Sequence, residues 1–191
     1  MRRNKIGLLG GSFNPAHAGH AYISENALSS LKLDEVWWLV SPLNPFKDEK
    51  DMQPLPQRLA YAKHFNANPA VKVTDLEREI GTRYTVDTLE YLTEKYHDTD
   101  FVWLMGDDLL PEFHLWKDWQ RILALADVAV FPRVMTEREL ESIPAVRLMK
   151  ENGKWHYINI PPYHLSASEI RPSNNNNNNT IIKDLDNDKN R

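Results

Sequence analysis

The stretch IGLLGGSFNPAHAGH, residues 6–20, decides the fold of this chain. It opens with a short apolar run, Ile6 to Leu9, which is typical of a strand buried on both faces between layers of helices. Glycines follow, and they let the backbone turn and approach a ligand closely. An amphipathic segment then begins at Ala18. The stretch therefore predicts a strand, a glycine turn and a helix in that order.

The same alternation of strand and helix patterns continues along the chain. Further apolar runs of strand length lie at 36–40, 101–105 and 128–131, with weaker ones at 71–73 and 157–160. Amphipathic segments lie at 18–31, 85–96 and 116–125. The alternation predicts an α/β fold, a Rossmann-like parallel sheet with right-handed crossovers and helices on both faces. Ligands bind such sheets beyond the carboxyl ends of the strands, near the point where the strand order reverses.

Length and composition limit the domain organisation. The 191 residues suit one domain, and we expect residues 1–173 to form it. Residues 174–191 open with six asparagines. We expect a flexible polar tail there, because such a segment cannot bury enough surface to offset its loss of conformational entropy. The absence of cysteine excludes disulfides, thiolate catalysis and cysteine-bound zinc.

Charge and hydropathy narrow the class of partner. The formal net charge of -4 argues against a nucleic-acid partner, which would require a basic face. No stretch reaches the roughly 18 apolar residues of a membrane span, and the amino-terminal apolar run is too short for a secretory signal. We therefore expect a cytoplasmic protein without a membrane partner.

The loop after the first predicted strand has the composition of a phosphate site. Gly10 and Gly11 allow a close approach of the backbone, Ser12 can donate a hydroxyl hydrogen bond, and the next helix points its positive end at the same place. His17 and His20 are three residues apart, which puts both on one face of the first helical turn. A lone histidine would more often be a surface or core residue. Two at this spacing, directly after a Gly-Gly turn, favour contact with phosphate.

These residues resemble a known signature. Gly11-Ser12-Phe13-Asn14-Pro15 with His17-Ala18-Gly19-His20 is similar to the signature of the HxGH nucleotidyltransferase superfamily. The match is to the form found in nicotinate-mononucleotide adenylyltransferases. The motif is long and specific, so it identifies the loop as a nucleotide site.

A second segment, near the carboxyl end, resembles the ISSTxIR signature of the same superfamily, in which hydroxyls and an arginine hold the triphosphate. It reads LSASEIR over residues 165–171, so Ser166, Ser168 and Arg171 match the phosphate-holding positions. Ala167 lacks the hydroxyl of the second serine. The family continues into a further helix after the arginine, whereas this chain enters its polyasparagine segment.

Other matches to the family lie between these two ends. Residues 83–88, RYTVDT, resemble the TxYTVDTL segment that opens a helix beside the nicotinate ring. Residues 106–109, GDDL, match the first four positions of the family's GxDxL pattern, and we prefer Asp107 to Asp108 as the contact to a nucleoside hydroxyl. Trp116 is the natural candidate for the aromatic residue that stacks on the pyridine ring in this family.

Two basic residues after predicted strands also match family positions. Lys47 lies where the family places a lysine near the mononucleotide phosphate, although a solvated loop lysine is an equal alternative and Lys50 is another candidate. Arg133 lies where an arginine approaches the adenine or its phosphates. For Trp119 we expect a half-buried helix residue, and for Asp87 an ordinary residue of a first helical turn.

The resemblance runs from Ile6 to Arg171. It implies transfer of AMP from ATP to nicotinate mononucleotide, giving deamido-NAD and pyrophosphate in NAD biosynthesis. It also implies Mg²⁺ held mainly through the ATP phosphates, and no metal site of protein side chains. The catalytic residues would be His17, His20 and Arg171. The residues assigned to ATP are Gly10, Gly11, Ser12, Phe13, Gly19, Gly106, Asp107, Arg133, Ser166 and Ser168. Those assigned to the mononucleotide are Asn14, Lys47, Tyr84, Thr85 and Trp116.

Two alternatives stay open at this stage. The substrate could be nicotinamide mononucleotide or that of another HxGH adenylyltransferase. The chain could also be a nucleotide-binding protein with impaired catalysis, because its carboxyl-terminal phosphate clamp departs from the family pattern. A homo-oligomer is compatible with either. The enzymatic interpretation requires His17, His20 and Arg171 to meet at one triphosphate site.

Overall fold

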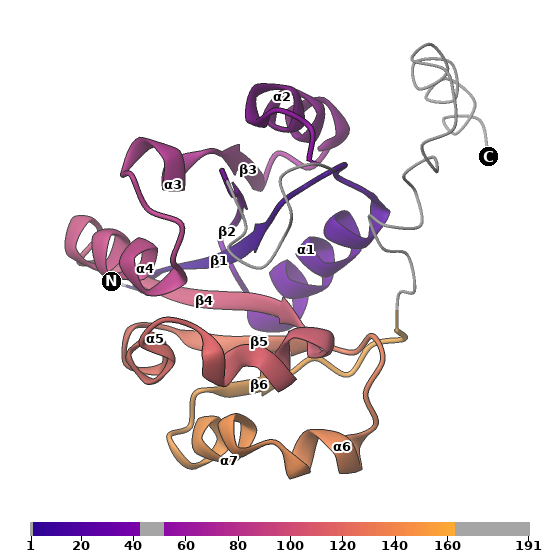
Figure 1. The fold of residues 1–191 in the computed structure, drawn as a ribbon, viewed down its shortest axis with the longest axis vertical. Helices are drawn as coiled ribbons and strands as arrows, with labels where there is room; N and C mark the ends of the chain where they lie inside the picture. Colours follow the sequence, from indigo (N-terminus) through magenta and orange to yellow (C-terminus); the bar gives the residue numbers. More distant parts are fainter. Residues whose placement is uncertain (1, 43–51, 163–191) are drawn as a thin grey trace.

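Six strands form one sheet in the part of the chain that the structure, a computed structural model, describes: residues 2–42 and 52–162. They are β1 (Asn4–Gly11), β2 (Glu35–Val40), β3 (Val71–Thr74), β4 (Thr99–Gly106), β5 (Asp127–Phe131) and β6 (Trp155–Tyr157). All neighbouring strands are parallel, in the order β3-β2-β1-β4-β5-β6 (Figure 1). This is the strand order of a Rossmann sheet, so the predicted architecture is confirmed.

Helices cover both faces of this sheet (Figure 1). They are α1 (Ala18–Leu31), α2 (Leu55–Phe65), α3 (Leu76–Glu79), α4 (Thr85–Lys95), the 3-10 helix η2 (Asp107–Leu115), α5 (Trp119–Leu125), α6 (Glu137–Ser142) and α7 (Pro144–Glu151). Helices α1 and α2 pack on one face, and α4, α5, η2 and α7 pack on the other. Successive residues of β1 show the two layers, because Leu8 and Leu9 are both buried but belong to different clusters.

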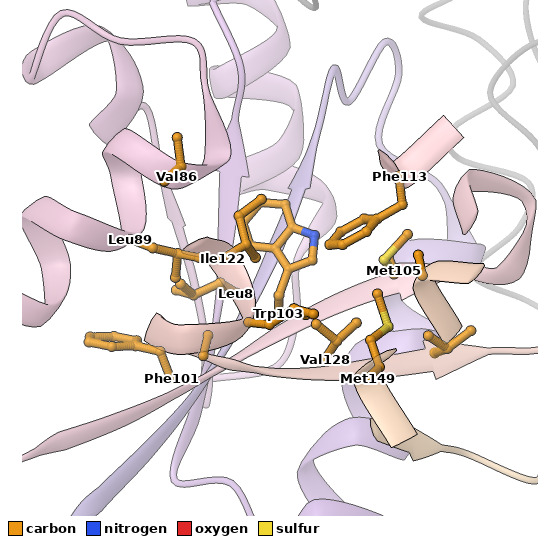
Figure 2. Close-up of a cluster of buried hydrophobic side chains, with 14 of the residues drawn as sticks. Leu8, Val86, Leu89, Phe101, Trp103, Met105, Phe113, Ile122, Val128 and Met149 are labelled. Atoms are coloured by element: carbon orange, nitrogen blue, oxygen red, sulfur yellow. The ribbon is translucent and has the colours of Figure 1, made fainter. Parts of the chain in front are cut away.

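The larger of the two hydrophobic clusters lies beneath α4, α5 and α7. Figure 2 shows part of it, with the indole of Trp103 at its centre and Phe113 of η2 nearby. Phe101, Trp103 and Met105 alternate along β4 and all face this layer, as the two-residue repeat of a strand requires. The central strands are therefore anchored on both faces, which makes their carboxyl ends rigid supports for a site.

The strand order reverses between β1 and β4. From β1 the chain proceeds outward through β2 and β3, then crosses back to β4 and proceeds outward on the other side. The two strands are paired in register, with Leu9 opposite Leu104, so their carboxyl ends at Gly11 and Gly106 are neighbours. This is the switch point at which such sheets bind ligands.

The boundaries of two predicted elements were wrong. The helix expected at 116–125 begins only at Trp119, because the preceding residues form η2 and Asp118 adopts a left-handed backbone with φ 45°. The strand expected at 157–160 lies instead at Trp155–Tyr157. Ile158 follows the strand and is buried, and its N–H still donates a hydrogen bond to the Val130 carbonyl of β5 at 2.9 Å.

Two expectations concern the remainder of the chain. The tail at 174–191 lies outside the described residues, so its flexibility stays a prediction, as does the extent of the domain over 1–173. Within residues 2–42 and 52–162, no helix combines the length and the apolar character that crossing a membrane requires.

Candidate active site

A pocket opens at the switch point, over the carboxyl ends of the central strands. Gly10 contributes from β1, Met105 and Gly106 from β4, and Arg133 from the segment after β5. His17, Gly19 and His20, at the start of α1, line the same pocket. The pocket therefore gathers residues from three strand ends and one helix amino terminus, which is where an anionic ligand of this fold is expected.

The two histidines are held by the backbone at the start of α1. Nδ1 of His17 accepts a hydrogen bond from the Gly19 N–H, and Nδ1 of His20 accepts one from the His17 N–H, both at 3.1 Å. Their ring centroids are 3.9 Å apart. Since each Nδ1 is an acceptor, the hydrogen of a neutral ring is on Nε2. Each imidazole thus presents an Nε2–H donor from a ring whose orientation the helix start fixes.

The predicted backbone placement of the first histidine was wrong. His17 is not inside the first helical turn but is the N-cap of α1, with an extended backbone at φ -150° and ψ 170°. The helix needs a side-chain acceptor at this position, and imidazole Nδ1 supplies it. The sequence carries the signal, because an acceptor followed three residues later by a second acceptor is a capping-box pattern.

Phe13 supports the second histidine from beneath. It is 1% exposed, and its ring stacks on His20 at 4.3 Å and on Trp38 at 5.2 Å between centroids. Phe13 is not among the residues that line the pocket. Its ring holds that of His20 in place, and its assignment to ATP stays a prediction. Its backbone has φ 46°, a left-handed conformation that costs a residue with a side chain about 1–2 kcal/mol.

The neighbouring loop residues lie beside the pocket and not in its lining. Gly11, Ser12 and Asn14 are absent from the lining, whereas Gly10 and Gly19 belong to it. Asn14 is 5% exposed, and its side-chain oxygen accepts a hydrogen bond from the Gln53 N–H at 3.2 Å. In the described residues it therefore joins the loop to the segment before α2.

A side chain at either of two pocket glycines would force neighbouring side chains to move. A Cβ on Gly10 would lie 2.7 Å from the ring of Trp103, and a Cβ on Gly106 would lie 2.5 Å from Cδ of Arg133. Both distances are shorter than carbon atoms tolerate. Trp103, which the sequence analysis did not single out, thus fills the space above Gly10, and Arg133 lies across the end of β4.

Asp107 secures the segment after β5. It is fully buried, and its carboxylate accepts hydrogen bonds from the N–H groups of Arg133, Val134 and Met135 at 2.9, 3.0 and 3.2 Å. It does not line the pocket. In the described residues the oxygens of Asp107 therefore serve the backbone, and its assignment as the nucleoside contact stays a prediction. Asp108 is the more exposed carboxylate, and it pairs with Arg133 at 3.2 Å.

The start of α4 is joined to the segment that carries Trp116. Asp87 accepts a hydrogen bond from the Thr82 hydroxyl at 2.9 Å and from the Lys117 ammonium at 2.7 Å. Lys117 Nζ also lies 5.0 Å from the centroid of the Tyr84 ring. Burial raises the pKa of Asp87, but the hydrogen bonds from Lys117 and Thr82 and the charge of Lys117 together outweigh it, so the pKa is lowered. Asp87 thus has a partner beyond its own helix, which an ordinary first-turn residue would lack.

Trp116 lines the pocket, whereas Tyr84 and Thr85, also assigned to the mononucleotide, do not. The stacking of Trp116 on the pyridine ring stays a prediction. Its ring packs edge-on against Trp103, with centroids 6.1 Å apart. Tyr84 is the N-cap of α4, and Thr85 is the first residue of the helix. Trp119 packs against Phe113 and the core, which confirms the expectation for it.

Several assigned residues lie outside the described residues. They are Lys47, Ser166, Ser168 and Arg171, together with the alternative Lys50. The meeting of Arg171 with the two histidines therefore stays a prediction.

Two buried ionisable residues that the sequence did not single out lie beside the site. Arg58 on α2 is 3% exposed and Glu77 on α3 is 5% exposed. The hydrogen-bonding groups of Ser41, which follows β2, contact both of them. Arg58 and Ala62 form the buried face of α2. Their spacing of four residues is the only signal the sequence offered for an inward-facing arginine.

A Rossmann sheet whose switch point carries an HxGH helix start defines the class of α/β nucleotidyltransferases. The cytidylyltransferase-like family model matches residues 8–173. The chain belongs to this family and, within it, to the nicotinate-nucleotide adenylyltransferases.

Individual relatives support this placement. A "Probable nicotinate-nucleotide adenylyltransferase" of Cereibacter sphaeroides is 43% identical over 178 residues, covering 87% of this chain and 96% of the relative. One of Methylorubrum extorquens is 50% identical over 182 residues, covering 87% and 98%. The structure of Plasmodium falciparum nicotinic acid mononucleotide adenylyltransferase complexed with NaAD superposes with a TM-score of 0.70 at 20% identity, over 87% of this chain and 82% of that one. The structural likeness supports the fold.

Proposed function

We propose that this enzyme transfers the AMP group of ATP to nicotinate mononucleotide, releasing pyrophosphate and giving deamido-NAD. The observation that carries the proposal is the pair His17 and His20, which line one pocket at the β1/β4 switch point with both Nδ1 atoms engaged by the backbone. The names of the relatives that this chain resembles support the same reaction.

The reaction requires no covalent intermediate on the protein. An oxygen of the mononucleotide 5′-phosphate forms a bond to the α-phosphorus of ATP, while the bond from that phosphorus to the bridging oxygen of pyrophosphate breaks in line. Donors fixed in place before the reaction stabilise the charge on the phosphoryl oxygens without reorganisation. We assign this task to the Nε2–H groups of His17 and His20, because their rings are already oriented.

The pyridine end of the mononucleotide is assigned to Trp116, which lines the pocket, and to the start of α4, which Lys117 joins to the segment that carries Trp116. An indole face can stack on a planar ring. The positive amino-terminal end of α4, at Tyr84 and Thr85, favours a carboxylate over a neutral amide. Lys117, held beside Tyr84 by Asp87, adds positive charge on the same side. These groups support a preference for the nicotinate form.

The triphosphate end is assigned to the opposite part of the pocket. Gly106 leaves room there for Arg133, whose guanidinium can contact adenine or phosphate. We assign further phosphate contacts to Ser166, Ser168 and Arg171, and a mononucleotide phosphate contact to Lys47, on the strength of the family motifs.

Mg²⁺ would neutralise charge on the phosphates and orient them. The described residues hold no group of three or more histidine, aspartate or glutamate side chains suited to a metal ion. We assign the ion mainly to phosphate and water ligands, as the family resemblance implies.

A pyrophosphate-release assay with ATP and Mg²⁺ tests the proposal. We expect release with nicotinate mononucleotide and much slower release with nicotinamide mononucleotide. His20→Ala should abolish most of the release, while His64→Ala, at an exposed position of α2, should leave it unchanged. Binding of ATP without release of pyrophosphate, with either mononucleotide, would favour the non-catalytic alternative. Faster release with the amide would reverse the substrate assignment.

A further inference from the structure

A buried arginine of α2 binds the backbone of three segments at the carboxyl edge of the sheet. Nε of Arg58 donates to the Gln53 carbonyl at 2.8 Å. Its Nη1 donates to the carbonyls of Ser12 and, at 2.9 Å, Ser41, and its Nη2 donates to that of Pro42 at 3.1 Å. These carbonyls belong to the loop after β1, the end of β2 and the approach to α2. One side chain therefore holds all three together.

The arrangement suits a guanidinium and no other cation. A guanidinium carries five N–H donors in a fixed plane, so it can reach carbonyls on several sides at once, whereas an ammonium has three donors at one point. Burying this charge is tolerable only when its donors are satisfied. Within residues 2–42 and 52–162 the partners of Arg58 are backbone carbonyls, and no ion pair to it is present there.

The bond to Ser12 determines the orientation of the next peptide group. The Ser12–Phe13 peptide is trans, since the single cis bond of the described chain precedes Pro15. In a trans peptide the C=O and the N–H point in opposite directions. With the Ser12 carbonyl turned inward to Arg58, the Phe13 N–H must point away from it.

Phe13 needs such a constraint. Its φ of 46° lies in the left-handed region, and residues with side chains stay there only where the surroundings determine the conformation from several sides. Arg58 fixes the peptide before Phe13, and stacking on Trp38 and His20 fixes its ring. The contacts run from Arg58 through Ser12 and Phe13 to the imidazole of His20.

We propose that Arg58 is a positioning residue of the adenylyl-transfer site, which orients His20 by holding the Ser12 carbonyl and thereby the Phe13 ring. The proposal rests on the function proposed above. Arg58 is placed outside the pocket lining, so it acts through the loop and not on the substrate.

Arg58→Lys and Arg58→Gln test the proposal. We expect kcat to fall by about 10-fold or more in both variants, since small misplacements of catalytic groups can cost this much. The lysine variant should not rescue activity although it keeps the charge, because an ammonium cannot place N–H donors on several sides in one plane. Leu92→Ala is the control, because Leu92 is fully buried on α4 and its loss lowers Tm without touching the loop. All variants are compared at a temperature at which each is folded.

A double-mutant cycle separates positioning from general stability. If Arg58 acts by orienting His20, then adding Arg58→Lys to His20→Ala should lower kcat little further, because the group to be positioned is already absent. Fully additive losses in kcat would overturn the proposal, as would wild-type kcat in folded Arg58→Lys.

Binding of a non-hydrolysable ATP analogue, measured by calorimetry, distinguishes failure of this proposal from failure of the proposed function. Absence of pyrophosphate release by the wild type would refute the function. The Kd of Arg58→Lys for the analogue still reports on the loop in that case, and we expect it to rise about 10-fold. An unchanged Kd would refute the positioning role.

Discussion

Replacing Glu77 by glutamine should change how the stability of this protein depends on pH. Glu77 lies on α3 with its carboxyl group buried, hydrogen-bonded to Ser41 and Thr88. Among the described residues its Oε2 has no hydrogen-bond partner. Burial raises the pKa of this carboxyl group to about 7, against an ordinary value of 4.5.

The sign and size of the effect follow from these two pKa values. Below pH 4.5 the carboxyl group is protonated in both the folded and the unfolded chain, so pH has no effect through it. Between 4.5 and 7 the unfolded chain loses the proton first, so the free energy of unfolding falls as pH rises. The 2.5 pKa units between 4.5 and 7 correspond to about 3 kcal/mol, at about 1.4 kcal/mol per unit. Glu77→Gln removes this loss.

Urea unfolding at pH 5 and at pH 8, followed by circular dichroism, measures the effect. We expect the variant to gain about 3 kcal/mol relative to wild type between the two pH values. Glu79→Gln is the matched control, since Glu79 lies two residues away on the same short helix and is exposed. If the wild-type and Glu77→Gln stabilities run parallel across this range, the carboxyl group is not protonated in the folded protein and the reasoning is refuted.

Three further predictions concern the active site and the far edge of the sheet. His17→Asn keeps a good N-cap, whereas His17→Ala loses it at a cost of about 1 kcal/mol in unfolding free energy. Both should lower turnover by roughly 10²–10³-fold, the effect of losing one preorganised donor, so wild-type turnover in His17→Asn would remove the histidine from the mechanism. Trp116→Ala should raise KM for nicotinate mononucleotide by about 10-fold or more, which is the scale of one ring-stacking contact. It should leave KM for ATP nearly unchanged. Equal changes in both KM values would contradict stacking. Hydrogen bonds from His156 and Lys154 lower the pKa of Asp127 to about 2 from 3.8. Asp127→Asn should therefore cost about 2 kcal/mol at pH 6, a difference that fades as pH falls through 2, and thermal unfolding across that range checks it.

The sequence allowed prediction of the fold, whereas the roles assigned to the site residues stay predictions. The strand, glycine turn and helix of residues 6–31 follow from patterns within a single stretch, and the structure places the helix at the predicted bounds. The position of Trp116 in the pocket was also predictable from a motif. In each case the signal is local, so no knowledge of distant neighbours was needed.

The remaining residues depend on contacts between distant segments. An arginine on α2 is ordinarily exposed, and only the packing of the loops after β1 and β2 around Arg58 buries it. Asp107 and Asp108 are adjacent, yet only the folded backbone of residues 133–135 shows that Asp107 is its acceptor. Sequence periodicity indicates which face is buried but not which groups it meets.

The contact between Gly10 and Trp103 has a consequence for mutagenesis of the strand end. A glycine beside a phosphate loop invites the conclusion that a ligand demands it, yet here an indole of the neighbouring strand fills the space a methyl group would need. Inactivity of Gly10→Ala would thus be uninformative about substrate. Combining Gly10→Ala with a smaller side chain at position 103 would make room for the added methyl group. The side-chain volumes at positions 10 and 103 therefore depend on each other. Homologous chains with a smaller residue at the position of Trp103 should accept a larger one at the position of Gly10.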